Sequence, residues 1–302
     1  MSNRSLSSTI AVAAVAAVLS LAPVPAAGQT SLPSFVRVAE AFGEGAQAPT
    51  AATKAWSPPQ TPDGQPDIQG FWSNRGVNSY DLEKGMSEEH LKITGIVPQD
   101  WRPAIVDPPD GKFPYQPWAA AKKKEIADNH TDLTKREYVD PHTLCFLSGI
   151  PRVLYQGGFQ ILQPPGHVVI LQEFNHAYRI IPLDGRPHVG ESIKLFMGDS
   201  RGHWEGNTLV VDVPNNNDKT WWDVVGSFHS DALHIVERYT FVDADTINYE
   251  ATIEDPKVFT RPVKMALLLK RNKEKGYELI EFACHEGQES QHIIKMLRST
   301  PK

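Results

Sequence analysis

From Gly158 onward the sequence consists of short apolar runs joined by tight turns, and this succession limits the fold more than any other feature. A parallel strand pair needs a crossover of a dozen or more residues, and these connections are far shorter, so a parallel sheet is excluded. We expect antiparallel hairpins throughout. The expected strands are 159–163, 167–174, 177–183, a strand at Trp204, 208–213, 233–242, 246–254, 262–270 and 277–284.

Eight or more strands in hairpin succession close most simply into an up-and-down β-barrel, because closure removes exposed strand edges. A two-sheet sandwich is the competing arrangement. We therefore predict a mainly β protein, an antiparallel up-and-down β-barrel of lipocalin-like type, with its first strand from Asp67. Short helices are expected at 87–93 and 117–128, and a C-terminal helix at 288–298 should pack on the barrel.

The N-terminus has the pattern of a secretory signal peptide, with Arg4 before the apolar run 10–21 and small residues after it. The run is too short for a transmembrane helix, which needs about 20 apolar residues, so no stable membrane insertion is expected. The sequence predicts a periplasmic or secreted protein. Its expected parts are a signal peptide at 1–28, a flexible segment at 29–66, and a single barrel domain at 67–302 with an irregular or helical insertion at 74–150.

The charge balance narrows the choice of partners. The 302 residues include 30 Lys and Arg against 36 Asp and Glu, a formal net charge of −6 at pH 7. Nucleic-acid binders cluster Lys and Arg, whereas the basic run 122–124 follows three alanines and fits the wet face of a helix. We expect a small organic ligand or substrate and no nucleic acid, and a homodimer is compatible with the sequence.

The chain has two cysteines, Cys145 and Cys284. In an oxidising compartment two free thiols are the less favoured outcome, so we expect a disulfide between them. A loop of more than about 100 residues closed in this way stabilises a fold by about 4 to 5 kcal/mol in the chain-entropy model. A catalytic thiol is the alternative, and it would need a histidine-paired environment.

Five ordered blocks resemble a family of uncharacterised secreted bacterial proteins. They are TPDGQPDIQGFW, HVVILQEFNHAYRIIPLDGRPH, GDSRGHWEGNTLVV, HIVERYTFVDADTINYEATIEDP and FACHEG, within residues 61 to about 295. Gly70 and Trp72 also form the G-x-W of lipocalin-like first strands. The resemblance implies export and a barrel-type fold, and it implies no particular activity. Asn207 departs from the family pattern, which has an acid there, at a position expected to be a turn.

The stretch 167–188 combines an apolar strand with Glu173, His176 and Arg179. An unpaired buried charge is costly, so these groups either occupy an exposed turn or line a pocket. Strand alternation puts His176 and Arg179 on opposite faces unless a bulge intervenes. The stretch therefore predicts one wall of a site that needs side chains from other strands.

Two carboxylates later in the sequence, Glu237 and Asp255, are expected to complete this site. Alternation along 246–254 predicts an apolar, inward-facing side, and Asp255 continues this side to the barrel mouth. Along 233–242 the apolar side is interrupted by Glu237. A carboxylate between aromatic side chains is either paired with an arginine or raised in pKa, which suits a general acid or base.

The first functional hypothesis is an acid–base enzyme, a lyase, isomerase or hydrolase, that needs no cofactor or metal. His176 would move the proton, Glu173 or Glu237 would orient it or act as the second group, Arg179 would hold an oxyanion, and Asp255 would bind at the mouth. The expected ligand-binding residues are Trp204, Trp221, Trp222, Tyr239 and His285.

Other interpretations stay open. A non-catalytic binder or carrier would use the aromatic side chains as its pocket, and an envelope-associated structural protein would use 74–150 as a partner surface. The charges could instead form ion pairs in which Arg179, Arg238 or Arg261 satisfies the carboxylates.

Neither a metal site nor a nucleophile motif is clearly indicated by the sequence. A metal site would draw on Glu173, His176, His188 or His285, whose spacings are not diagnostic. Residues 198–202 match G-x-S-x-G but no helix follows them, so we interpret them as a turn.

Overall fold

The structure, a computed structural model, describes residues 56–74, 76–77, 79–84, 103–282 and 284, without the side chain of His176. The chain divides into two units, Met1–Thr53 and Lys54–Lys302, and every described residue belongs to the second. The predicted signal peptide, the predicted helices at 87–93 and 288–298, and His285 lie outside the described residues.

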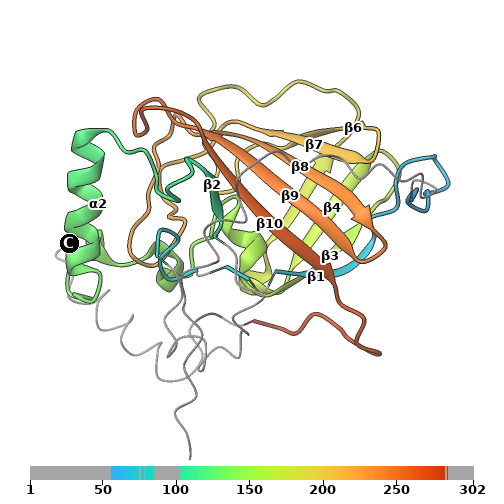
Figure 1. Ribbon diagram of the computed structural model, residues 1–302, viewed down its shortest axis with the longest axis horizontal. Coiled ribbons are helices and arrows are strands. Elements are labelled where there is room, and N and C mark those ends of the chain that lie inside the picture. The colour runs from blue at the N-terminus through green and yellow to red at the C-terminus, as the bar shows by residue number, and fades with distance from the viewer. Residues whose placement is uncertain (1–55, 75, 78, 85–102, 283, 285–302) are drawn as a thin grey trace, which may run out of the picture. The chain divides into compact units, whose positions relative to one another are not determined.

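In this part of the chain one antiparallel sheet holds all the named strands (Figure 1). They are β1 (Gly70–Ser73), β2 (Ile105–Asp107), β3 (Gly158–Leu162), β4 (His167–Gln172), β5 (Tyr178–Pro182), β6 (Arg201–Glu205), β7 (Thr208–Val213), β8 (His234–Asp243), β9 (Thr246–Glu254) and β10 (Val263–Arg271). The helix α2 (Pro117–Asn129) matches the prediction and starts with proline, whose missing N–H is harmless there. Short 3-10 helices are η2 (Arg136–Tyr138), η3 (Pro141–Leu144), η4 (Arg152–Tyr155) and η5 (Phe174–His176).

The strands form an almost closed up-and-down barrel, as predicted, and not a sandwich. Their order is β5-β4-β3-β1-β10-β9-β8-β7-β6, in which β1 joins the first meander to the last strand. Neighbours along this path are antiparallel, so β5 and β6 at its two ends point the same way. The ladder is interrupted between them. When an odd number of strands closes into a barrel and the other neighbours are antiparallel, one pair of neighbours must be parallel, and we call this place the seam.

Side chains close the seam between β5 and β6. Arg179 on β5 donates from Nε to the hydroxyl oxygen of Ser200, 2.8 Å away and just before β6. Gly202 on β6 lies so close to β5 that a β-carbon would be 2.8 Å from Ile181 and from Leu183. A side chain at this position would have to displace the ends of these two side chains, so glycine suits the tight packing at the seam.

Alternating side chains fill the barrel, as the sequence predicted. Trp72 of β1 is completely buried, and its indole N–H donates to the carbonyl oxygen of Ile68 at 2.9 Å. Full burial of one such apolar side chain contributes roughly 1.5–3 kcal/mol, so this interior dominates the stability of the barrel. The inward residues of β8 and β9 are Ile235, Glu237, Tyr239, Phe241, Ile247, Tyr249, Ala251 and Ile253.

One predicted strand is wrong. The described residues 277–282 form no strand, so the hairpin expected from 262–270 and 277–284 exists only in its first half. β10 pairs with β9 along one edge and with β1 and β2 along the other. Because β1 and β9 already pair with Lys270, where the expected hairpin would begin, a following strand cannot pair with β10 there.

The predicted disulfide is confirmed. Cys145 and Cys284 are bonded, with Cα atoms 5.9 Å apart and a sequence separation of 139 residues. The bond attaches the coil after β10 to the end of η3. A bonded sulfur is not a nucleophile, so the catalytic-thiol alternative is wrong.

Loops and α2 cover one end of the barrel. Figure 1 places α2 beside this end, and the ammonium group of Lys123 donates to the carbonyl oxygen of Val225 at 3.0 Å. Three aromatic rings stack on one another at this end, with centroids 5.0 to 5.8 Å apart: Phe113, Trp222 and Phe259. None of the described helices is long and apolar enough to cross a membrane.

Candidate functional site

The predicted residues Arg179 and Glu237 form an ion pair inside the barrel. Arg179 projects from β5 and is 5% exposed, and Glu237 projects from β8 and is 0% exposed. Two guanidinium nitrogens of Arg179 donate to the two carboxylate oxygens, with 3.0 Å from Nη1 to Oε1. This bidentate geometry is the strong form of the arginine–carboxylate pair. The ion-pair hypothesis is confirmed for these two residues.

Two tyrosines complete the surroundings of Glu237. The hydroxyls of Tyr239 and Tyr249 donate to Oε1 at 3.0 and 2.9 Å. Burial, and then the adjacent carboxylate, raise the pKa of both tyrosines well above the ordinary value, so both stay protonated. Burial alone would lower the pKa of Arg179, but the facing Glu237 holds it above the ordinary value. We call these four residues the interior cluster, and its charges are balanced.

Glu173 belongs to a different place. Its carboxylate accepts the backbone N–H of Gly158 at 3.2 Å and that of Ile280 at 3.1 Å. It thereby fastens the start of β3 and the coil after β10 to the end of β4. None of these partners belongs to the interior cluster.

Asp255 forms a third separate set of contacts. It is 2% exposed and follows β9 at the barrel end, as predicted. Its carboxylate accepts the N–H and the hydroxyl of Ser230 at 2.6 and 2.8 Å, and the N–H of Lys257 at 3.1 Å. The described carboxylates Glu173, Glu237 and Asp255 therefore share no hydrogen-bond partner, and no common site is built from them.

The predicted ligand-binding aromatics are spread over the barrel. Trp222 is completely buried at the covered end and donates its indole N–H to the carbonyl oxygen of Ile150 at 3.1 Å, with Trp221 beside it. Tyr239 belongs to the interior cluster. Trp204 on β6 differs from Trp222, because its buried indole nitrogen has no acceptor within the described residues.

His188, a candidate metal ligand, and Ser200, of the G-x-S-x-G match, both lie in structural surroundings. His188 places Nδ1 2.9 Å from Asp199 and Nε2 3.0 Å from Asp212. Ser200 directly precedes β6, which begins at Arg201, so a strand and not a helix follows it, although the residues 198–200 are not assigned as the expected turn. Across the described residues, no group of three or more His, Cys, Asp or Glu side chains is arranged to hold a metal ion.

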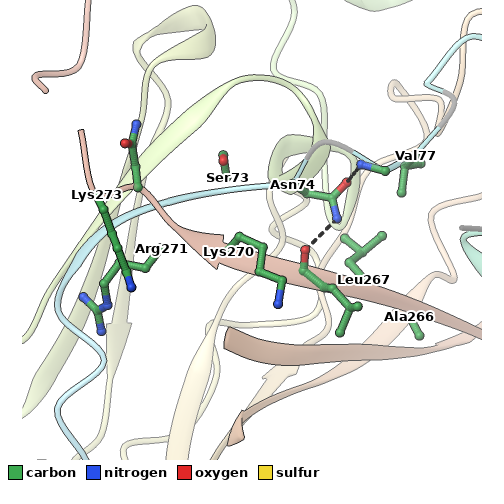
Figure 2. Close-up of a pocket in the computed structure, with 11 residues that line it drawn as sticks. Ser73, Asn74, Val77, Ala266, Leu267, Lys270, Arg271 and Lys273 are labelled. Atoms are coloured by element: carbon green, nitrogen blue, oxygen red, sulfur yellow. Dashed lines mark hydrogen bonds between the residues drawn. The ribbon is translucent and has the colours of Figure 1, made fainter. Parts of the chain in front are cut away.

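A pocket opens on the outer face of the barrel, where two short strands share one edge of β10 (Figure 2). β1 pairs with one end of β10 and β2 with the other, and no ladder pair of either strand reaches 266–269. The side chain of Asn74 bridges part of this interruption, since its amide nitrogen donates to the carbonyl oxygen of Leu268 at 3.0 Å. We call this hollow the β10 pocket.

The β10 pocket has a volume of about 510 Å³ and two unlike ends. Val77, Leu267 and Ala266 lie toward one end, and the side chains after Leu268 lie toward the other, as Figure 2 shows. That second end carries three cations, and no carboxylate is among the described lining residues. The lining residues there are Ser73, Lys270, Arg271, Asn272 and Lys273.

Arg271 is built into the wall of the pocket. Its Nη1 donates to the carbonyl oxygen of Gln69 at 2.6 Å and its Nε to that of Ala244 at 2.9 Å. The guanidinium also lies 4.3 Å over the ring of Trp72, a cation–π contact. Burial lowers its pKa from the ordinary value. These contacts fix the guanidinium group of Arg271.

Lys270 and Lys273 are held more loosely. Lys270 donates to the hydroxyl oxygen of Thr246 at 2.7 Å, and Lys273 donates to the carboxylate of Asp245. An ammonium group has three N–H donors, so each lysine has donors beyond this contact. Sequence reasoning missed these residues, because a basic run at a strand end is typical of any solvated turn.

Comparisons with known proteins give little further guidance. No protein-family model matches the sequence, and no curated protein matches it. Among solved structures, the chain is similar to a crystal structure of a mutant of the fluorescent protein UnaG, with 15% identity over 39% of this chain and 72% of that one. The TM-score is 0.22, which is too low to support any argument. The resemblance to secreted bacterial proteins stays a prediction.

Proposed function

We propose that this chain is an exported, non-catalytic binding protein or carrier that holds a small organic molecule in the β10 pocket. The pocket itself carries the proposal. Its volume of about 510 Å³ lies within the roughly 300–1,000 Å³ typical of small-molecule sites. Apolar side chains that bury a ligand, combined with a few polar groups that orient it, are the usual composition of such sites.

The contacts of the ionisable residues support binding over acid–base catalysis. Glu237 already accepts from Arg179 and from two tyrosine hydroxyls in a position without solvent exposure. A general base must reach the proton that it removes. Glu173 and Asp255 are likewise occupied by backbone N–H groups. The catalytic roles given to these residues, and to His176, stay predictions.

Export is the second part of the proposal. The disulfide between Cys145 and Cys284 supports it, because disulfides persist in oxidising compartments and are rare in the cytosol. The predicted signal peptide agrees with this compartment. The absence of a nucleic-acid partner and the compatibility with a homodimer stay predictions from the sequence.

Filling the pocket tests the proposal. Ala266→Trp places an indole on the pocket lining, and Ile180→Trp is the matched control on the outer face of β5, where residue 180 is 52% exposed. Two fluorescent dyes report binding: anilinonaphthalene sulfonate, an anion, and phenylnaphthylamine, its uncharged analogue. We expect at least one dye to bind the unmodified chain and the Ile180→Trp variant, and to be lost in Ala266→Trp. Equal binding by both variants, or no binding by the unmodified chain, would contradict the proposal.

A further inference from the structure

We propose that the molecule held in the β10 pocket is an organic anion with an apolar body, its acidic group contacting Lys270 and Lys273 and its body lying against Val77, Ala266 and Leu268. This inference rests on the proposed binding function and specifies the class of ligand. In this proposal Lys270 and Lys273 recognise the acidic group of the ligand, and Arg271 holds the wall of the pocket in place.

The sign of the charge in the pocket is the first reason. The whole chain carries a formal net charge of −6, yet the described lining of the pocket has three cations and no carboxylate. Asp245 lies nearby, where it pairs with Lys273 and comes within 4.0 Å of Arg271, whereas the described acceptor of Lys270 is the uncharged hydroxyl of Thr246. A concave surface lined by one sign of charge concentrates ligands of the opposite sign.

The position of the charges along β10 is the second reason. Ala266, Leu268 and Lys270 lie on the outer face of the strand, so the lining changes from apolar to cationic in the direction of the chain. Figure 2 shows this change, with Val77 and Ala266 at one end and Lys273 at the other. Leu268 is 42% exposed, and a ligand body can cover it. A molecule with one anionic end matches this arrangement better than a uniformly polar one.

The uncovered edge of β10 is a poor template for a peptide strand, because it is short and part of its backbone is already hydrogen-bonded. Ladder pairs of β1 and β2 bound the segment 266–269 at both ends. A strand advances roughly 3.3 Å per residue, so the interruption accommodates about four residues, and the N–H of Ala266 within it already donates to the carbonyl oxygen of Ala104 at 2.8 Å. Asn74 also occupies the carbonyl oxygen of Leu268, which an added strand would use. A compact small molecule is the occupant that fits.

The two dyes separate the ligand class from binding as such, because they share an aromatic body and differ in the sulfonate. The test variant is Lys270→Gln with Lys273→Gln in the full chain. The matched control is Lys264→Gln with Lys257→Gln, which removes the same charge from exposed lysines outside the pocket lining. Arg271 is left unchanged, since its contacts hold the wall together.

We expect the test variant to bind anilinonaphthalene sulfonate about tenfold more weakly, a loss typical of two partly exposed charge contacts. Phenylnaphthylamine should bind the test variant and the unmodified chain equally. The control variant should bind the sulfonate as the unmodified chain does, and added salt should weaken sulfonate binding only where both pocket lysines are present.

The outcomes identify which inference fails. The test and control variants could bind the sulfonate equally well while the Ala266→Trp variant binds neither dye. That result would overturn the anionic class of ligand and leave the binding function intact. A parallel loss of both dyes in the test variant would also overturn it, because the lysines would then act on the shape of the pocket. Sulfonate binding that Ala266→Trp does not affect would overturn the pocket itself.

Discussion

The interior cluster and the β10 pocket both place cationic side chains on barrel strands, but they use the charge in opposite ways. Arg179 is 5% exposed, faces Glu237, and has its guanidinium donors directed at fixed acceptors. Lys270 and Lys273 lie at the surface, and each donates to a single described acceptor.

This difference separates structure from recognition. A buried charge must be compensated within the fold, since desolvation is expensive, and full compensation leaves nothing for a ligand. A surface cation is already solvated, so it can exchange water for an anion at low cost. Ionisable residues on strands therefore indicate a binding site only when their donors remain available.

Removing the compensating charge should have the largest effect. Glu237→Gln leaves Arg179 buried without a counter-charge, and we expect it to lower the free energy of unfolding by about 3 to 5 kcal/mol. Urea unfolding followed by tryptophan fluorescence measures this. Glu205→Gln, at the exposed pair with Arg238, is the control and should be indistinguishable from the unmodified chain. A similar small change at Glu237 would mean that the buried arginine is compensated in another way.

His142 tests a half-buried ionisable group whose pKa is lowered by its surroundings. Its ring stacks on Phe174 at 4.1 Å, and its buried Nε2 has no hydrogen-bond partner among the described residues. Burial, and then the charge of Arg152, lower its pKa from 6.5 to about 4. Because the unfolded chain takes up the proton first, stability should fall as pH decreases from 6.5 to about 4 and then stop changing for this group.

His142→Phe removes this titration and keeps an aromatic ring against Phe174. We expect the stability lost between neutral pH and pH 4 to shrink by about 3 kcal/mol, from the size of the pKa shift. Unfolding curves at several pH values provide the measurement, with the exposed His203→Phe as the control. An unchanged pH slope in His142→Phe would show that this histidine is not the buried titrating group.

A substitution at the seam between β5 and β6 should change the free energy of unfolding by a smaller amount. In Gly202→Ala the added methyl group meets Ile181 and Leu183, so we expect a loss of about 1 to 3 kcal/mol from overpacking. Gly190→Ala is the control, since a β-carbon there has no neighbour within 4 Å. Thermal unfolding compares the two variants. A neutral Gly202→Ala would indicate that β5 and β6 can move apart at the seam.

The pocket lysines should have the smallest effect on stability. The double substitution Lys270→Gln and Lys273→Gln should leave the unfolding midpoint unchanged, because exposed contacts of this kind contribute little. Differential scanning calorimetry is sensitive enough to test this. A clear destabilisation would place these lysines with the interior cluster, as structural residues, and would weaken the contrast between the two regions.

The fold was largely predictable because its strands follow one another in hairpins. The strand 208–213 and the strand 246–254 are observed with the predicted bounds, and α2 begins at the predicted proline. The predicted strand 277–284 was wrong for a reason outside its own residues, since β1 and β9 already pair with β10 at Lys270, where the hairpin would begin. Local pattern cannot reveal which edges are free.

The site was less predictable than the fold. Alternation correctly placed Glu237 inside, and it allowed pairing with an arginine. It could not reveal that Glu173 would contact the coil after β10 at Ile280, 107 residues away. The β10 pocket was missed altogether, because the contact between Asn74 and Leu268 joins residues 194 positions apart.

The sequence by itself determined most of the strands, their antiparallel direction, the inward and outward faces, and the pair of cysteines that bond, but neither β2 nor the absence of a strand at 277–282. These depend on alternation and turn chemistry, which act over a few residues. The tertiary structure alone decided which charges meet and where the barrel wall is hollow. Arg179 reaches Glu237, and β1 and β2 leave part of β10 uncovered, only when barrel closure brings distant strands together.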